Sequence, residues 1–213
     1  LVVHMSHEAG VHVGGVGAVL DGLLGTRAYG DAVTRTLLVG PLNRTDVAAM
    51  DRLTDPTNGV RIAYSSLHGI YQGGENGQRA AFERIEREYG VTLLCGTRHC
   101  GTKACEIILV DAGQADQGQL NQFKFDLWEN FGLDSARHDT NAEYNLYLAL
   151  ARPILAEAAA LGDVPHADTF DPYPGRGVRA LYQGHDVAVG TVDLMAELGV
   201  DVGAEVRAHL ARL

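Results

Sequence analysis

The feature that most constrains this fold is the alternation of short, continuous apolar runs with longer segments of helical periodicity. Short runs without polar alternation are typical of parallel strands that are buried on both faces of a sheet. The strands predicted in this way are 1–5, 35–39, 60–64, 91–95, 107–110 and 179–182. The helices predicted between them are 16–24, 47–53, 79–89, 120–131 and 142–161. This order predicts an α/β fold with a doubly wound, mainly parallel sheet, in which residues 1–5 form a central strand.

The charge balance excludes some kinds of partner. The chain has 17 Lys and Arg residues against 27 Asp and Glu residues, which gives a net charge of −10. It therefore lacks the basic excess that binding to nucleic acid or to an anionic membrane surface needs. No apolar run approaches the roughly 18 residues of a membrane-spanning helix.

Three cysteines lie close together, at Cys95, Cys100 and Cys105. An odd number of cysteines, without a secretory signal at the start, predicts a reducing and therefore cytoplasmic compartment. His99 could join them in a zinc site, but their spacing matches no standard structural site. We favour burial of the thiols as small hydrophobic groups.

A glycine cluster follows the first predicted strand. Gly14, Gly15 and Gly17 stand where the helix 16–24 begins. Exposed backbone N–H groups and the helix dipole at such a turn favour an anion such as a phosphate. The dinucleotide fingerprint G-x-G-x-x-G is not met, because Leu20 occupies the third glycine position, which counts against a nucleotide-dependent oxidoreductase. A glycine-rich connection needed only for packing is the other interpretation.

Three segments resemble the glycogen synthases, and the animal and fungal branch in particular. The first is EAGVHVGGV at residues 8–16, in which Gly14 follows Glu8 at a step of six residues. The second is FKFDLWE at residues 123–129, followed by GLDS at 132–135 and by Asp139 and Asn141. The third is YQGHD at residues 182–186, followed by Gly190. The segments keep the family's order and span nearly the whole chain.

The resemblance implies a glycosyltransferase of the GT-B fold, in which two Rossmann-like domains face a cleft. Residues 1–213 match the N-terminal, acceptor-side domain, and the C-terminal nucleotide-binding domain is expected outside this chain. The implied reaction transfers a sugar from a nucleotide sugar, such as UDP-glucose or ADP-glucose, to a glucan or another carbohydrate acceptor. No metal or other cofactor is implied, and the fragment alone is expected to be inactive. A Rossmann-like nucleotide-binding or regulatory module without catalysis is the alternative.

The resemblance also assigns the site residues. His185 would lie beside the transferred sugar, and Glu8 would fix the glycine loop or meet an acceptor hydroxyl group. We expect the glycine loop and His185 at the same sheet edge, because both follow predicted strands. The residues expected to bind the diphosphate or the sugar are Gly14, Gly15, Gly17, His12 and Asp186.

Trp128 has two interpretations. It could be a platform on which a sugar stacks. Its spacing from Phe125 and Phe131 makes a stripe on one helix face, and we therefore favour a structural role in packing.

Overall fold

The computed structural model describes residues 1–11, 13–72, 76–100, 103–160, 167–173 and 176–204. The sequence predicts one domain across all 213 residues. In the structure the contacts cluster into two compact units, Leu1–Glu157 and Ala158–Leu213. No helix of the described residues is long and apolar enough to cross a membrane.

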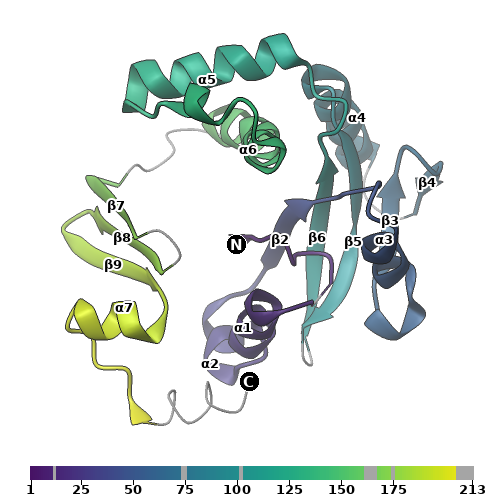
Figure 1. Cartoon of the computed structure of the whole chain (residues 1–213). Coiled ribbons are helices and arrows are strands. Elements are labelled where there is room, and N and C mark those ends of the chain that lie inside the picture. The colour runs from purple at the N-terminus through teal and green to yellow at the C-terminus, as the bar shows by residue number, and fades with distance from the viewer. Residues whose placement is uncertain (12, 73–75, 101–102, 161–166, 174–175, 205–213) are drawn as a thin grey trace. The chain divides into compact units, whose positions relative to one another are not determined.

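The first unit is built on a six-stranded sheet of order β1-β2-β6-β5-β3-β4 (Figure 1). The strands are β1 (Val2–Met5), β2 (Thr36–Pro41), β3 (Arg61–Ser65), β4 (Ile70–Tyr71), β5 (Thr92–Cys100) and β6 (Lys103–Asp111). Strands β1, β2 and β6 pair in parallel, and β5 is antiparallel to both β6 and β3. Strand β3 thus runs with β1, β2 and β6, so four of the six strands share one direction, and only β5 and β4 oppose them.

One expectation about this sheet is wrong, and one of its connections was not foreseen. Among the described strands, β1 pairs only with β2 and lies at the edge of the sheet, not at its centre. Strands β5 and β6 form an antiparallel hairpin in which Cys100 pairs with Lys103. The physical reason is the short connection, because a parallel crossover needs about a dozen residues or more.

Helices cover both faces of the sheet. Alternate side chains of the strands point to opposite faces, so Leu38 packs in one core cluster and Val39 in the other. The cluster that contains Val39 includes residues of α4, α5 and α6, and the cluster that contains Leu38 includes residues of α1 and α3. The helices of this unit are α1 (Gly15–Leu24), α2 (Arg27–Ala32), α3 (Val47–Thr54), α4 (Asn76–Tyr89), α5 (Gln117–Phe131) and α6 (Ala142–Ala160). The α/β prediction is confirmed, and the arrangement is compatible with a Rossmann-like fold.

The packing role favoured for Trp128 is wrong. Helix α5 buries Leu120 and Lys124, whereas the side chains of Phe125, Trp128 and Phe131 are 50%, 57% and 61% exposed. Lys124 and Trp128 are one helical turn apart and share one side of α5, so the aromatic rings lie beside the buried positions and are exposed because no described element covers them. Aromatic spacing of three residues indicates neighbouring positions on the helix, but it does not tell whether another element will cover them.

The second unit contains a separate antiparallel sheet of order β7-β8-β9. Its elements are β7 (Thr169–Tyr173), β8 (Gly177–Tyr182), β9 (His185–Gly190) and α7 (Val192–Glu197). The β8–β9 turn is made by Gln183 and Gly184, whose φ angles are 50° and 78°. Two positive φ values are what a two-residue hairpin needs, because such a turn matches the twist of its strands. The strand predicted at 179–182 therefore belongs to this hairpin and not to the large sheet.

Candidate functional site

The chain that leaves β1 runs close across β2. The N–H group of Ser6 donates to Val39 O at 2.9 Å. A Cβ atom at Gly40 would lie 2.2 Å from Ser6 O and 2.8 Å from the Cβ atom of Ala9. Glycine at this β2 position is therefore a requirement of the close approach, because real Cβ atoms do not come so near a backbone oxygen. The approach places Glu8, which is 5% exposed, under the glycine loop.

The carboxylate of Glu8 holds the glycine loop. Its Oε2 atom accepts hydrogen bonds from the N–H groups of Val13, Gly14 and Gly17 at 2.9, 2.8 and 2.9 Å. Gly14 is the N-cap of α1 and has no side chain to cap the helix, so Glu8 supplies the anion that the helix N-terminus favours. Burial by itself raises the pKa of Glu8, but the three N–H donors and nearby His7 outweigh burial, and the net pKa is lowered.

Arg98 fastens the same loop from beneath. This residue of β5 is 2% exposed. Its guanidinium donates to the carbonyl oxygen of Glu8 at 3.0 Å and to Asp21 Oδ1 in α1 at 2.8 Å. Its Nε atom donates to Cys100 Sγ at 3.2 Å. Strand β5 and helix α1 are thus joined through one buried cation.

The first turn of α1 keeps backbone donors for which the described residues offer no acceptor. No described residue accepts a hydrogen bond from the N–H group of Gly15 or Val16, and the first N–H groups of a helix have no partner within it. Gly15 is exposed, and a Cβ atom built there would meet nothing within 4 Å. A side chain at this position would therefore extend into open space, and the φ of Gly15 does not itself demand glycine.

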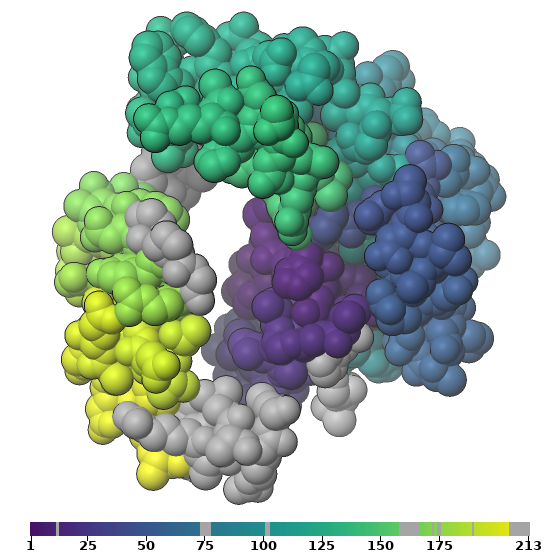
Figure 2. Space-filling view, viewed as in Figure 1, coloured from purple at the N-terminus to yellow at the C-terminus, as the bar shows by residue number. Residues whose placement is uncertain are grey.

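A cavity of about 300 Å³ adjoins the glycine loop, between the ends of β1 and β2 and helix α3. Figure 2 shows the N-terminal segment, in purple, beside the blue segment on this face. Its lining includes His7, Glu8 and Arg52. The Nε atom of Arg52 is buried and has no hydrogen-bond partner among the described residues. An oxygen-rich anion or a hydroxyl group in the cavity could accept from this donor.

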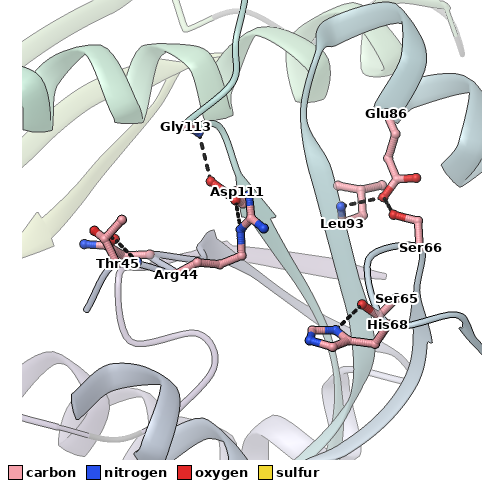
Figure 3. Close-up of polar contacts among 10 residues, drawn as sticks. Arg44, Thr45, Ser65, Ser66, His68, Glu86, Leu93, Asp111 and Gly113 are labelled. Carbon is pink, nitrogen blue, oxygen red and sulfur yellow. Dashed lines mark hydrogen bonds and ion pairs between the residues drawn. The ribbon is translucent and has the colours of Figure 1, made fainter. Parts of the chain in front are cut away.

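The loop from β2 to α3 forms one wall of the cavity and is anchored on both sides. Figure 3 shows Arg44 directed at Asp111, the last residue of β6, with which it forms an ion pair. Asp111 also accepts from the N–H group of Gly113 at 2.9 Å. In the loop, Asn43 Oδ1 accepts from the N–H and hydroxyl groups of Thr45 at 3.1 and 2.7 Å. These contacts fix the position of Asn43, which lines the cavity.

The other polar contacts in Figure 3 support the framework. Glu86 Oε1 accepts from the Ser66 hydroxyl and from the N–H group of Leu93, each at 2.7 Å. Ser65 Oγ lies 2.9 Å from His68 Nδ1, which resembles a nucleophile and its base. Ser65 is only 1% exposed, so this pair presents no accessible nucleophile and we interpret it as a turn contact.

The predicted site residues belong to two different sheets and units. Glu8, Gly14, Gly15 and Gly17 lie together at the end of β1. His185 begins β9 and pairs with Tyr182 in the sheet of the second unit. The expectation that His185 shares a sheet edge with the glycine loop is therefore wrong, because the strand before it belongs to another sheet.

Asp186 follows His185 in β9 of the same hairpin. Asp186 forms an exposed ion pair with Arg179, with Nε–Oδ1 at 2.8 Å. The hydrogen bond from Arg179 lowers the pKa of Asp186, and the pair connects β8 to β9 on the surface of the hairpin. His12 lies outside the described residues.

The cysteines are buried thiols, as expected. Cys95, Cys100 and Cys105 are 6%, 0% and 0% exposed. Burial, with a smaller effect of nearby Glu86, raises the pKa of Cys95 to about 12. In the part of the chain that the structure describes, no group of three or more His, Cys, Asp or Glu side chains is arranged to hold a metal ion.

Sequence analysis missed two cationic residues of this site, Arg98 and Arg52. Arg98 lies 90 positions from Glu8, and the pairing of β5 in the sheet is what brings them together. Arg52 stands on a short amphipathic helix where a charged residue has no distinguishing pattern. No model of a known protein family matches the sequence, and a search of curated proteins finds no match either.

Proposed function

We propose that this chain is the N-terminal, acceptor-side half of a glycogen synthase-like GT-B glycosyltransferase. The observation that carries the proposal is the glycine loop held by Glu8, in which Val13 and Gly14 line a cavity and the N–H groups of Gly15 and Val16 have no acceptor among the described residues. Its support is the combination of this loop with the three segments that resemble the glycogen synthases. The donor in this proposal is a nucleotide sugar such as UDP-glucose or ADP-glucose.

The proposed chemistry asks the loop to stabilise a leaving group. Cleavage of the donor's sugar–phosphate bond develops negative charge on the diphosphate. Fixed N–H donors at a helix N-terminus stabilise such charge without reorganising during the reaction. The buried Glu8 carboxylate and the Arg98 guanidinium keep the loop in one position, and Arg52 offers an additional donor to a phosphate or sugar oxygen. The nucleoside would bind to the C-terminal domain of the GT-B fold, which the proposal places outside this chain.

A second candidate function has one observation in its favour. His185 and Asp186 belong to a hairpin of the second unit, and Asp186 is paired with Arg179. A nucleotide-binding or regulatory module that lacks catalysis does not need His185 or Asp186 close to the glycine loop. Such a module would bind a nucleotide sugar without transferring its sugar.

The experiment is a transfer assay on the protein that carries both domains, with UDP-glucose or ADP-glucose and an oligosaccharide acceptor. Gly15→Val fills the open space at the loop and should lower the transfer rate by about 10²–10³, as expected when an oxyanion-type donor is lost. Gly30→Val is the matched control, because Gly30 is also an exposed helical glycine with nothing within 4 Å of its Cβ position.

The two variants should have similar melting temperatures. Equal transfer rates in Gly15→Val and Gly30→Val would contradict the proposed function. Nucleotide-sugar binding without transfer in the unsubstituted protein would favour the non-catalytic module.

A further inference from the structure

Helix α5 presents an exposed aromatic surface that the proposed reaction does not use. Phe125 and Trp128 are 50% and 57% exposed, and their ring centroids lie 5.9 Å apart. Apolar ring surface is unfavourable in water and gains free energy when it is covered. Exposed aromatic rings that are bordered by polar groups therefore mark interaction sites. The two rings therefore indicate a binding surface on the first unit.

A cavity of about 310 Å³ lies beside these two rings. Its polar lining comes from α5 and from the turn that follows it, and includes Asn121, Lys124, Ser135 and Asp139. Aromatic surface next to a few convergent polar groups is the usual composition of a small-molecule site.

The charges in this cavity are paired. Lys124 is 5% exposed and its Nζ atom donates to Asp139 Oδ1 at 2.6 Å. Asp134, which also lines the cavity, pairs with Arg137 at 2.6 Å. A phosphate would meet two carboxylates here. The lining therefore favours a neutral ligand with many hydroxyl groups over an anion.

Several of the polar groups retain hydrogen-bonding capacity. The ammonium group of Lys124 has three N–H donors, of which one is directed at Asp139. Ser135 Oγ accepts from Tyr144 at 2.9 Å, which leaves its own hydroxyl hydrogen to donate. The side chain of Asn121 accepts from Gln117 through Oδ1, and its amide nitrogen can still donate.

We propose that this surface binds a hexopyranose chain, with the C–H face of one sugar ring stacked on Trp128. A pyranose ring combines an apolar face with a rim of hydroxyl groups, and the cavity combines an aromatic ring with Lys124, Ser135 and Asn121. The inference deepens the proposed function, on which it rests, by locating a binding site for the glucan acceptor apart from the glycine loop. A second binding site raises the effective concentration of acceptor ends near the site of transfer.

The test uses the chain's own fluorescence, because Trp128 is its single tryptophan. The 213-residue chain is titrated with maltoheptaose, an α-linked glucose oligomer, and in a second arm with the β-linked cellohexaose. A saturable change in tryptophan emission with either sugar supports the site, and the arm that responds identifies the linkage. No donor and no second domain are needed. Loss of binding here and loss of transfer in Gly15→Val are therefore separate results.

Two variants make the test specific. Phe125→Ala removes a ring that lines the cavity and should weaken binding by about tenfold. Phe131→Ala, which removes an exposed ring of the same helix outside the cavity lining, should change the affinity by less than twofold. Trp128→Ala, followed by calorimetry with the same sugar, should abolish binding.

Three results would overturn the inference. One is the absence of any response to both oligosaccharides, and another is equal weakening by Phe125→Ala and Phe131→Ala. The third is a tryptophan emission that depends on protein concentration, with dimers in sedimentation, because the aromatic surface would then be an interface between copies of the chain.

Discussion

At the scale of single residues, Glu8 organises the glycine loop. One carboxylate oxygen accepts three backbone N–H groups, and the hydrogen bond from Gly17 is buried. An unsatisfied buried donor costs as much as or more than a hydrogen bond contributes. Of the two roles implied for Glu8, fixing the loop is the one that these contacts describe. A contact with an acceptor hydroxyl stays a prediction.

Glu8→Gln should lower the free energy of unfolding by about 2 kcal/mol at neutral pH, because charge-assisted hydrogen bonds are replaced by weaker ones. The pKa of Glu8 is lowered from its ordinary value of 4.5, so its stabilisation is present above that pH. This stabilisation is lost as the pH falls through the lowered pKa of the folded state. Urea unfolding at several pH values should therefore show the two proteins converging below pH 4.5.

The matched control is Glu129→Gln, on the exposed surface of α5. It should leave the free energy of unfolding nearly unchanged at every pH. A Glu8→Gln difference that stays constant down to low pH would mean that the carboxylate charge does not hold the loop.

At the scale of elements, the contact between β5 and α1 determines where the loop lies. Arg98 reaches from the sheet to Asp21 in the helix and to the backbone of Glu8. The guanidinium geometry suits this role, since one rigid group donates in three directions. The side chain of Arg98 is 3% exposed and that of Asp21 is 29% exposed, so solvent screens this pair only in part.

Arg98→Lys should lower the free energy of unfolding by about 3 kcal/mol, because an ammonium cannot reach all three acceptors and leaves a partly buried carboxylate weakly paired. Arg35→Lys is the control, since Arg35 and Glu106 form an exposed pair between neighbouring strands, and exposed pairs contribute little. Guanidinium unfolding measures both changes. Similar losses in the two variants would argue against a buried clamp.

The β8–β9 hairpin carries the histidine that the resemblance assigns to the sugar. His185 is exposed and pairs with Tyr182 through the backbone, so His185→Ala should leave the melting temperature unchanged. In the protein that carries both domains, it should lower the transfer rate by about 10²–10³ if the side chain donates to the reacting sugar. Asp168→Ala, another exposed position of this unit, should leave transfer intact. Normal transfer by His185→Ala would mean that this histidine is part of the hairpin and has no role in the transfer reaction.

At the scale of the whole molecule, the chain comprises two compact units, and the proposed active site is completed by a further domain. The 213-residue chain should therefore give no transfer from UDP-glucose or ADP-glucose to an oligosaccharide, because the proposal assigns nucleoside binding to a domain outside this chain. Measured product should match a protein-free blank, while the protein with both domains is active in the same buffer. Turnover near the typical enzyme rate of about 10 s⁻¹ would show that the chain holds a complete site.

Much of the first unit is predictable from local patterns. The predicted strands 1–5 and 35–39 correspond to β1 and β2, and the predicted helix 16–24 corresponds to α1. Apolar runs and helical periodicity report burial that repeats along the chain, and this local information is enough to locate such elements. The glycine loop was found for the same reason, since its position between a strand and a helix is a local feature.

The sequence by itself determined the α/β class, the position of the glycine loop and the burial of the three cysteines. Only the tertiary structure decided that β1 is an edge strand, that the strand before His185 joins a separate sheet, and that the aromatic face of α5 is exposed. The Glu8–Arg98 contact was also decided there. The physical reason is that strand order and helix orientation depend on which surfaces meet after the chain closes on itself. Periodicity records that a side chain has a preferred face and does not record what that face will contact.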